Sequence, residues 1–536
     1  MRPGVPRLAR DLYPVWRFAR GYRRFVREPV DPPAARARVR ERLDGREERF
    51  LRIARERVFG HARSPYLPLF RAAGCDFSDL RAMVESRGLE EALEALAAAG
   101  VRVSIDEFKA RMPIRRASLA HDVAEADFDN PFLSHAIEAT SGGTRSAGTR
   151  VLVELDFIAA LADDTALAFD AHDLWPCTQC VWLPMGGTAS IAVNLYAKLG
   201  RPVARWWSHV APAALGPRRR RWEQFVMAWS RLAGAALPEP EHTPLSEAPA
   251  VAAWLAGEIG RGRRPCLTTY ASTAVRVCRA ARERGLDLAG AVFLTIGEPL
   301  TPAKRRAIED AGARVVARYA VTEAGILGYG CAASAECDDV HVLSDDLAVI
   351  AAPRLVGREQ VPVSGLLVTS LLPQSPKILV NVETGDYAEL SERDCTCALG
   401  RAGLTTHLSG IRSFEKLTGE GMTFVGTRIL RVLEDVLPRR FGGQPSDYQL
   451  LEVEDAAGIT HLEMRVDPAL GPLDEARVRA VFLAALEDDR RVRPMANIWA
   501  QADIVRVRRA PPIPTAMGKV LPFHLVTLQQ AERRTQ

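Results

Sequence analysis

A short stretch rich in glycine and hydroxyl side chains is the first feature of the sequence that could do chemistry. Residues 140–149 read T-S-G-G-T-R-S-A-G-T and precede the apolar run 151–153, so we expect a loop between a helical stretch and a strand. Such a loop can present backbone N–H groups and hydroxyls to phosphate oxygens, because glycine lets the chain approach a ligand closely. It is not a Walker phosphate loop, whose lysine-containing pattern is absent, and similar loops without phosphate duties are common.

A second candidate segment has a glycine directly after an apolar run. Residues 295–301 read T-I-G-E-P-L-T and come before a stretch rich in lysine and arginine that we predict to be a helix. A strand that ends in a glycine turn at the carboxyl edge of a sheet lies where α/β folds usually hold ligands. The alternative is a plain strand-to-helix turn without a ligand.

The third segment, residues 318–325, reads R-Y-A-V-T-E-A-G and follows another apolar run. Glu323 could hold a Mg²⁺ ion that bridges nucleotide phosphates, because this ion prefers hard oxygen ligands. Thr322 could donate a hydrogen bond to a phosphate oxygen. A threonine followed by a glutamate is also a common way to begin a helix, and that alternative stays open.

The fourth group combines the motif T-G-D at residues 384–386 with two distant cations, Arg412 and Lys519. An aspartate after a glycine turn can accept hydrogen bonds from both hydroxyls of a ribose, which is the role we consider for Asp386. A lysine on a terminal loop can stabilise the charge that develops between a carboxylate and an α-phosphate. Taken singly, each of these side chains could equally be solvated surface.

Five metal-binding side chains form two short groups: Cys331, Cys337 and His341, then Cys395 and Cys397. Thiolates and imidazole are the ligands that structural Zn²⁺ prefers, so two such groups brought together would make a closed tetrahedral site. Five donors compete for four positions. We favour Cys331, His341, Cys395 and Cys397, with Cys337 left over.

Two other candidate groups are interpreted as parts of the core. Cys177 and Cys180 form a C-x-x-C pattern, which can indicate redox chemistry or half of a metal site. Their apolar and aromatic neighbours instead indicate buried thiols at the entrance of a strand. His209, near Trp206 and Trp207, could line an acyl pocket, although a packed histidine is the simpler interpretation.

The spacing of apolar residues, which indicates helices or strands, changes twice along the chain. The first 110 residues have the spacing of helices, the middle alternates short apolar runs with turns and helical stretches, and the rest mixes both over about 120 residues. We predict a mixed α/β fold with a helical N-terminal segment (1–115) packed on a large domain (116–411), and a small α+β domain (412–536). Its last strand is expected at residues 504–507.

Composition excludes several classes of protein. A chain of 536 residues with 47% hydrophobic and 26% charged residues is predicted to form two or more globular domains. The net charge of +5 comes with no zinc finger or aromatic-basic motif, so nucleic-acid binding is not indicated. No apolar run is long enough for a transmembrane segment or a secretion signal. We therefore expect a cytoplasmic protein, and its nine cysteines suit thiols or metal ligands rather than disulfides.

The succession T-S-G-G-T, G-E-P-L-T, Y-A-V-T-E, T-G-D, G-I-R and P-T-A-M-G-K resembles the acyl-adenylate-forming enzyme superfamily, specifically its phenylacetate-CoA-ligase-like branch. The resemblance covers residues 132–520. It implies a large N-terminal domain, a small mobile C-terminal domain, and the ATP-dependent activation of a carboxylic acid to an acyl adenylate. It further implies ATP and Mg²⁺ as cofactors and transfer of the acyl group to an acceptor, commonly coenzyme A, in an AMP-forming acid–thiol ligase. It also allows a homodimer.

The resemblance assigns roles to individual residues of this chain. It implies a nucleotide held as follows: Ser141, Gly142, Gly143 and Thr144 at the phosphates; Gly297, Glu298 and Pro299 at the adenine; Tyr319 against the purine face; Thr322 on a phosphate; Asp386 on the ribose. Glu323 would bind Mg²⁺. Lys519 of the mobile domain would be catalytic, together with Thr144 and Arg412. Related ligases of the branch carry a comparable Cys-x-Cys after T-G-D, and some bind zinc there.

The chain departs from the family pattern at four places, which include Ala320 in place of the usual glycine and an extra Ile411 before the arginine. Arg145 and the next two residues replace the usual Gly-Lys-Pro, and Asn381 begins the triplet N-V-E in place of the usual Arg-Tyr-Arg. These changes leave the acid and the acceptor open, so a carrier-protein thiol, an amine or a hydroxyl remains an alternative to coenzyme A. An alternative of another class is a nucleotide-binding pseudoenzyme in which these substitutions have ended turnover.

Overall fold

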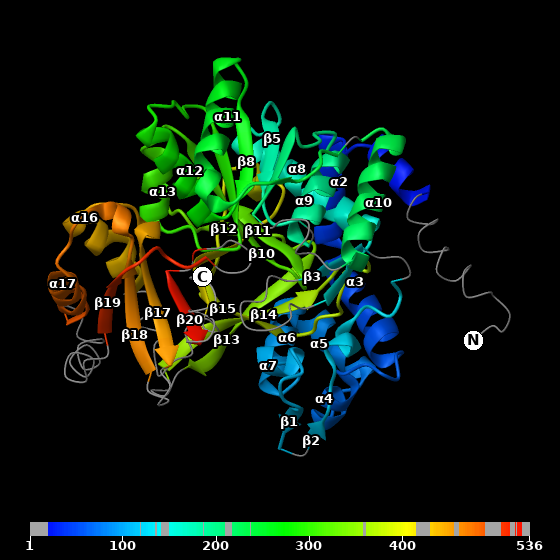
Figure 1. The fold of residues 1–536 in the computed structure, drawn as a ribbon. Helices are drawn as coiled ribbons and strands as arrows, with labels where there is room; N and C mark the ends of the chain where they lie inside the picture. Colours follow the sequence, from blue (N-terminus) through cyan, green and yellow to red (C-terminus); the bar gives the residue numbers. More distant parts are fainter. Residues whose placement is uncertain are drawn as a thin grey trace.

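The computed structural model describes thirteen stretches of the chain: residues 20–117, 119–133, 137–140, 150–185, 187–209, 217–235, 237–356, 361–413, 429–454, 460–487, 505–514, 520 and 522–527. Figure 1 shows helices of the N-terminal segment in blue, a long sheet with covering helices in colours from cyan through green to yellow, and a smaller sheet in orange and red. The predicted mixed α/β fold is confirmed.

The N-terminal segment is helical, as predicted. Its α-helices are α2 (Pro32–Asp44), α3 (Arg46–Ile53), α4 (Leu67–Ala72), α5 (Phe77–Arg87), α6 (Leu89–Ala98) and α7 (Ile105–Phe108). Local sequence explains where they begin. Asp31 caps α2 by accepting a hydrogen bond from the N–H of Ala34, with proline at the first helical positions, and Asp76 and Asp79 form a capping box at α5.

The large sheet contains twelve strands among the described residues, in the order β13-β14-β15-β16-β12-β11-β10-β9-β8-β5-β6-β7. They are β5 (Thr178–Trp182), β6 (Arg205–Ser208), β7 (Glu241–His242), β8 (Pro265–Thr269), β9 (Val292–Ile296), β10 (Arg314–Val321), β11 (Gly325–Gly330), β12 (Val340–Val342), β13 (Leu347–Val356), β14 (Val361–Ser370), β15 (Val382–Glu392) and β16 (Thr406–Ser413). Strands from β10 to β7 in this order pair in parallel, and the others pair antiparallel. The parallel half therefore has a single carboxyl edge.

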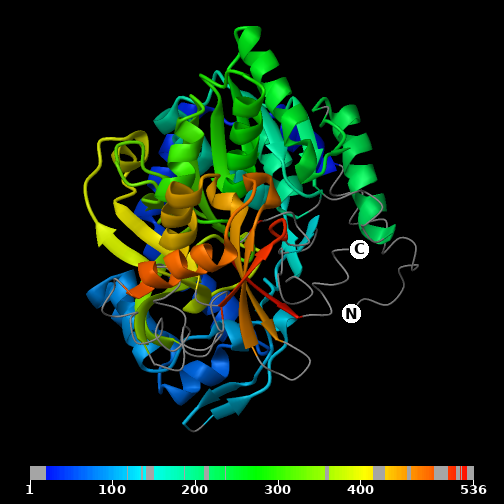
Figure 2. The same ribbon diagram turned by 60° about the vertical axis from the view of Figure 1, so that its left-hand side comes forward.

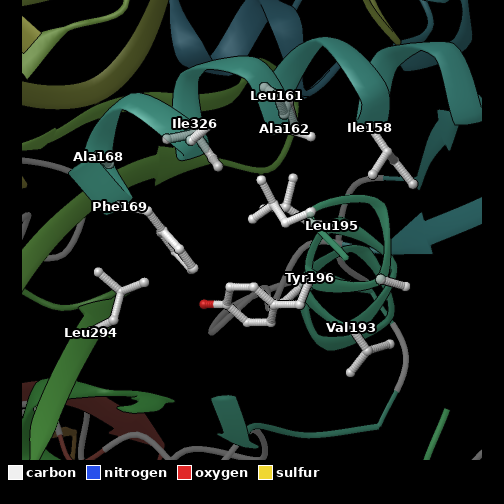
Figure 3. Packing of buried hydrophobic residues seen from close by; sticks show 14 of the residues in the cluster. Ile158, Leu161, Ala162, Ala168, Phe169, Val193, Leu195, Tyr196, Leu294 and Ile326 are labelled. Carbon is white, nitrogen blue, oxygen red and sulfur yellow. The ribbon is translucent and has the colours of Figure 1, made fainter. Parts of the chain in front are cut away.

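Helices cover the parallel half of the sheet (Figure 1). They are α8 (Leu155–His172), α9 (Thr188–Lys198), α10 (Pro217–Ala233), α11 (Ala248–Gly260), α12 (Ala271–Glu283) and α13 (Pro302–Glu309). Figure 3 shows Leu161 and Phe169 of α8 and Tyr196 of α9 packed with Leu294 of β9 and Ile326 of β11. Full burial of each such side chain stabilises the fold by about 1.5–3 kcal/mol, so the sheet forms a rigid platform for the turns at its edge.

The small C-terminal unit has its own sheet and core. Its strands are β17 (Tyr448–Glu454), β18 (Thr460–Val466), β19 (Val505–Arg509) and β20 (Phe523–Thr527), in the order β19-β18-β17-β20, with helix α17 (Glu475–Glu487) packed on them. Figure 2, turned so that this unit comes forward, shows its strands in orange and red. The prediction that the strand near residues 504–507 is the last one was wrong. Strand β20 follows it and pairs in parallel with β17, a non-local pairing that local periodicity does not reveal.

Ion pairs join the small unit to helices α12 and α13 of the large one. Arg306 Nη2 lies 3.0 Å from Asp435 Oδ1, and the buried Lys304 Nζ lies 3.6 Å from Glu434 Oε1. Arg279 of α12 also pairs with a buried aspartate at the start of β17. The domain boundaries at residues 115 and 411 remain predictions. None of the described helices has the length and apolar character needed to span a membrane.

An arginine of α2 fastens the N-terminal segment to the large unit. The Arg42 guanidinium forms ion pairs with Asp163 (2.9 Å), Asp164 (3.2 Å), Asp345 (2.7 Å) and Asp346 (3.2 Å), all of which are buried. Burial raises the pKa of Asp345 to about 7 and that of Asp164 well above its usual value. The largely buried guanidinium of Arg42, together with that of Arg38 on Asp163, therefore compensates part of the negative charge at this junction.

Candidate functional site

Two of the four nucleotide motifs lie at neighbouring strands, and a third lies on a more distant strand of the same sheet. In the parallel pair β9 and β10, Ile296 is the register partner of Arg318, so β9 ends before Gly297 beside the point where β10 continues through Tyr319. Gly297 has φ +75°, a left-handed conformation that favours glycine at this turn. The T-G-D motif lies within β15, a strand of the antiparallel half. The strand followed by a glycine turn that was expected at residues 295–301 is thus present in the described part of the chain.

A direct hydrogen bond joins Tyr319 to Asp386. The Tyr319 hydroxyl donates to Asp386 Oδ2 at 2.9 Å. Burial raises the pKa of Tyr319 well above its usual value and the neighbouring Asp386 charge adds to this shift, so the phenol stays protonated. Gly385, within β15, has φ +81°, a left-handed conformation that favours glycine. The two residues expected at the purine and the ribose therefore occupy one small region, although 67 positions separate them in the sequence.

The glycine- and hydroxyl-rich loop, with Ser141, Gly142, Gly143 and Thr144, lies outside the described residues. The structure does describe the two strands that flank this loop. Thr140 of β3 (Ile137–Thr140) pairs with Arg150 of β4 (Arg150–Val153) in an antiparallel ladder. The expectation of a helical stretch before the loop was wrong, because a four-residue strand is too short for periodicity to identify.

Thr322 and Glu323 lie in the turn that joins β10 to β11, so they do not begin a helix. The buried Glu323 carboxylate forms an ion pair with the ammonium of Lys109, which follows α7. A buried carboxylate at a turn needs a cation, and here a lysine supplies it. Lys109 was not predicted, since it lies 214 positions away in no recognisable motif.

The Glu298 side chain is engaged with the protein. Its carboxylate accepts hydrogen bonds from the backbone N–H (2.9 Å) and hydroxyl (2.8 Å) of Ser272, at the start of α12. Lys304 Nζ, on α13, lies 3.6 Å away. These contacts anchor the turn containing Gly297 and Pro299. Any contact of the turn with adenine would therefore involve its backbone rather than the carboxylate.

Arg412 lies on β16, the strand next to the T-G-D motif. It is the register partner of Tyr387, and Ser413 is the partner of Asp386. Its Nη1 donates to Asp338 Oδ2 at 2.8 Å, so the guanidinium is held in an ion pair. The predicted catalytic Lys519 lies outside the described residues.

The four favoured zinc ligands are brought together in space. Cys331 Sγ lies 3.4 Å from Cys395 Sγ, and Cys397 Sγ lies 3.1 Å from His341 Nε2. All four ligand atoms lie within 4.8 Å of one another. A hydrogen bond from Cys331 lowers the pKa of Cys397, and a further one from His341 adds to this. The same hydrogen bond with Cys397 raises the pKa of Cys331. The cluster thus favours a thiolate, the form that binds metals.

Surrounding contacts orient the cluster. The Nδ1 atom of His341 lies 2.7 Å from the carbonyl of Leu404, an interaction that directs Nε2 toward the thiols. A Cβ on Gly400 would lie 2.3 Å from the carbonyl oxygen of Cys395, so only glycine fits this turn. Cys337 is not part of the cluster, because its thiol lies 3.1 Å from a carbonyl before α13. Cys177 and Cys180 are buried at the start of β5, as expected.

Comparison with known proteins finds structural likeness at low sequence identity. No protein-family model matches the chain, and no curated protein sequence matches it significantly. A 2-hydroxyisobutyryl-CoA ligase solved with 2-hydroxyisobutyryl-AMP and coenzyme A is 17% identical, with 92% of each chain covered and a TM-score of 0.45. An anthranilate-CoA ligase solved with anthranoyl-AMP is 12% identical, covering 83% of this chain and 76% of its own, with a TM-score of 0.40. A malonyl-CoA ligase solved with methylmalonyl-CoA and AMP is 16% identical over 75% of each chain, with a TM-score of 0.33. The function of this chain is therefore inferred from its own residues.

Proposed function

We propose that this chain activates a carboxylic acid with MgATP to an acyl adenylate and then transfers the acyl group to coenzyme A, as an AMP-forming ligase of the phenylacetate-CoA-ligase-like branch. The observation that carries the proposal is the hydrogen bond between Tyr319 and Asp386, which joins the Y-A-V-T-E and T-G-D motifs. These motifs are predicted to bind opposite parts of one nucleoside. Their order in the sequence, with G-E-P-L-T between β9 and α13, supports the same assignment.

The proposed chemistry has two steps that balance in atoms and charge. A carboxylate oxygen attacks the α-phosphorus of ATP, the bond to the β-phosphate breaks, and pyrophosphate leaves with the electron pair. The acceptor thiol then attacks the acyl carbon, loses its proton and displaces AMP. Activation is needed because a carboxylate has no adequate leaving group, whereas AMP leaves readily.

In the first step, the formation of the acyl adenylate, we propose that different residues of this chain bind different parts of MgATP. Asp386 accepts from the ribose hydroxyls, and Tyr319 fixes its orientation. Thr322 and the loop with Thr144 donate to phosphate oxygens. Glu323 is proposed to hold a Mg²⁺ ion as a carboxylate ligand, with its ion pair to Lys109 giving way when the ion binds; when bound, the ion would neutralise phosphate charge.

Lys519 and Arg412 complete the proposed catalytic group. The small domain would carry Lys519 to the carboxylate and α-phosphate during adenylation and then rotate, so that the acceptor can enter. Arg412 lies on the strand beside the one that contains Asp386. It is proposed to mark the junction of the two domains and would approach the ribose or phosphates once released from Asp338.

Trapping with hydroxylamine tests the proposed function. The full chain is incubated with MgATP, hydroxylamine and a panel of aromatic, fatty and amino acids, and hydroxamate formation is measured. We expect a hydroxamate with at least one acid, followed by a thioester when coenzyme A replaces hydroxylamine. A hydroxamate without a thioester would favour the carrier-protein, amine or hydroxyl alternative. No hydroxamate with any acid, despite ATP binding, would favour the pseudoenzyme.

Replacing Asp386 with alanine is expected to raise the Kd for ATP by about 10-fold to 10²-fold, because hydrogen bonds to a charged group contribute about 1.5–3 kcal/mol. Isothermal titration with ATP measures the effect. The matched control is Glu389→Ala, which removes an exposed carboxylate from the same strand. Equal ATP affinity of the Asp386 variant and the wild type would contradict the ribose assignment.

We propose further that the cluster of Cys331, His341, Cys395 and Cys397 binds one structural Zn²⁺. The convergence of four ligand atoms within 4.8 Å supports this. Elemental analysis of protein purified without added zinc should give about one equivalent per chain, falling to well below half in Cys397→Ser. The control variant Cys337→Ser should keep its zinc. Zinc-free protein with full activity, or equal loss from both variants, would refute the site.

A further inference from the structure

Three ion pairs join the small unit to helices α12 and α13, and in each of them the large unit supplies the cation and the small unit the carboxylate. The pairs are Arg279 with Asp447, Lys304 with Glu434 and Arg306 with Asp435. Glu434 and Asp447 are buried, and a buried carboxylate is costly without its partner. The orientation of the small unit in this structure therefore depends on cations of the large unit.

The ammonium of Lys304 is shared between the small unit and the turn after β9. Its Nζ atom lies 3.6 Å from Glu434 Oε1, 3.6 Å from Glu298 Oε2 and 3.5 Å from the carbonyl oxygen of Pro299. Glu298, Lys304 and Glu434, here called the Lys304 triad, have side chains that are at most 4% exposed. Glu434 lies in η6 (Val432–Val436), a π-helical turn that runs into α16 (Leu437–Phe441), which lies near α13 in Figure 1. One buried ammonium thus contacts both the turn proposed to hold adenine and the small unit.

The position of Lys304 in α13 is not explained by the helix itself. The helix begins after Thr301, whose hydroxyl accepts a hydrogen bond from the N–H of Lys304 at 3.3 Å. This places a lysine in the first turn, where the helix dipole disfavours a cation, and the first turn contains no acidic residue to compensate it. The two carboxylates of the Lys304 triad, which come from outside the helix, supply the compensation.

The two carboxylates of the Lys304 triad differ in their other partners. Glu298 also accepts hydrogen bonds from the N–H and hydroxyl of Ser272. Glu434 Oε1 is sealed from solvent and has no hydrogen-bond partner among the residues that the structure describes, and its distance to Lys304 exceeds that of a hydrogen bond. If the small unit turns away, Glu298 keeps its partners and Glu434 gains water. The pair of Lys304 with Glu434 can therefore break and re-form as the small unit moves.

We propose that Lys304 is a positioning residue for the two-step reaction, whose ammonium joins the turn that contains Gly297 to the small unit and holds that unit in the orientation seen here. The inference rests on the proposed function, in which the small unit takes different orientations in the two steps. Since one orientation serves one step, loss of the ammonium is expected to slow the step that uses this orientation and to spare the other.

Hydrogen exchange of the full chain without ligands tests the contact independently of catalysis. Lys304→Met removes the charge and keeps much of the side-chain volume, and Glu434→Gln keeps the shape of its side chain. In both variants the amides of η6 should exchange at least about 10-fold faster than in the wild type, because η6 loses its packing when the small unit separates from α13. The amides of β18, in the core of the same unit, should keep their wild-type rate. An unchanged rate in η6, or an equal increase in β18, would overturn the proposal.

The matched control is Arg305→Met. Arg305 is the neighbouring cation on α13, but its partners, Glu309 and the carbonyl of Ala335, belong to the large unit. This variant should leave the exchange of η6 unchanged. An increase as large as that in Lys304→Met would show that any loss of charge from α13 has the effect, and would refute a specific role of Lys304.

The two half-reactions distinguish a positioning role from a merely structural one. With an acid that the wild type activates, single-turnover pyrophosphate release measures adenylation, and a prepared acyl adenylate with coenzyme A measures acyl transfer. In Lys304→Met the ratio of the two rates should change by about 10-fold or more, whereas a general loss of structure lowers both rates together. Equal effects on both steps would overturn the positioning role. If the wild type activates no acid, the proposed function fails, and hydrogen exchange still decides whether Lys304 holds the small unit.

Discussion

Replacing Lys519 with alanine is expected to slow acyl-adenylate formation by about 10² or more and to leave the Kd for ATP nearly unchanged. The ammonium is proposed to contact charge that develops between the carboxylate and the α-phosphate only as they react. Its removal therefore costs transition-state stabilisation rather than ground-state binding. Single-turnover pyrophosphate release measures the first effect, and isothermal titration measures the second.

The second half-reaction supplies an internal control for Lys519→Ala. Since the lysine is proposed to leave the site before acyl transfer, the variant should convert a chemically prepared acyl adenylate to product at nearly the wild-type rate. A matched variant, Arg508→Ala, removes an exposed cation from β19 of the same unit and should leave both steps unchanged. Equal adenylation rates for Lys519→Ala and wild type would contradict the assignment.

Replacing Arg42 with methionine is expected to lower the free energy of unfolding by about 3–5 kcal/mol at pH 8, because it leaves buried carboxylates without their partner. Four aspartates surround this one guanidinium at 2.7–3.2 Å. Methionine keeps much of the side-chain volume, so the loss reports mainly on charge. Urea unfolding of the full chain measures it. The control Arg24→Met breaks an exposed pair with Glu28 and should cost less than about 1 kcal/mol.

The pKa shifts of Asp345 and Asp164 give the Arg42 prediction a pH dependence. Because burial raises the folded-state pKa of Asp345 to about 7 from 3.8, the folded protein binds more protons than the unfolded chain between these values. The contribution of this carboxyl to stability is therefore largest below pH 4 and falls as the pH rises toward 7. Protonation also removes the charge that Arg42 compensates. The Arg42→Met penalty should shrink from pH 8 to pH 5.5, and a constant or growing penalty would contradict this account.

The local parts of the fold were predictable because each depends on neighbouring residues. The strand ending at Ile296, the helix that starts at Pro302 and the hydrophobic pattern of β17 all follow from periodicity and turn chemistry over fewer than ten positions. Strand β20 and the short strand β3 were missed. Both are brief, and their existence depends on pairing with strands elsewhere in the chain.

In the candidate site, too, residues identified by their chemistry were predictable, whereas contacts between distant parts of the chain were not. The four favoured metal ligands were identified because thiol and imidazole chemistry restricts the choice, and the fold then excluded Cys337 through its contact near α13. Lys109 beside Glu323 was not foreseeable, since an ion pair over 214 positions leaves no local pattern. The engagement of Glu298 with Ser272 was missed for the same reason.

The central claim, attack of a carboxylate oxygen on the α-phosphate, is tested most directly by isotope transfer. An acid that forms a hydroxamate with this protein is labelled with oxygen-18 in its carboxylate and turned over with MgATP and an acceptor, and the products are analysed by mass spectrometry. The account predicts one labelled oxygen in the phosphate of AMP and none in pyrophosphate. Label recovered in inorganic phosphate together with ADP, or unlabelled AMP, would contradict it.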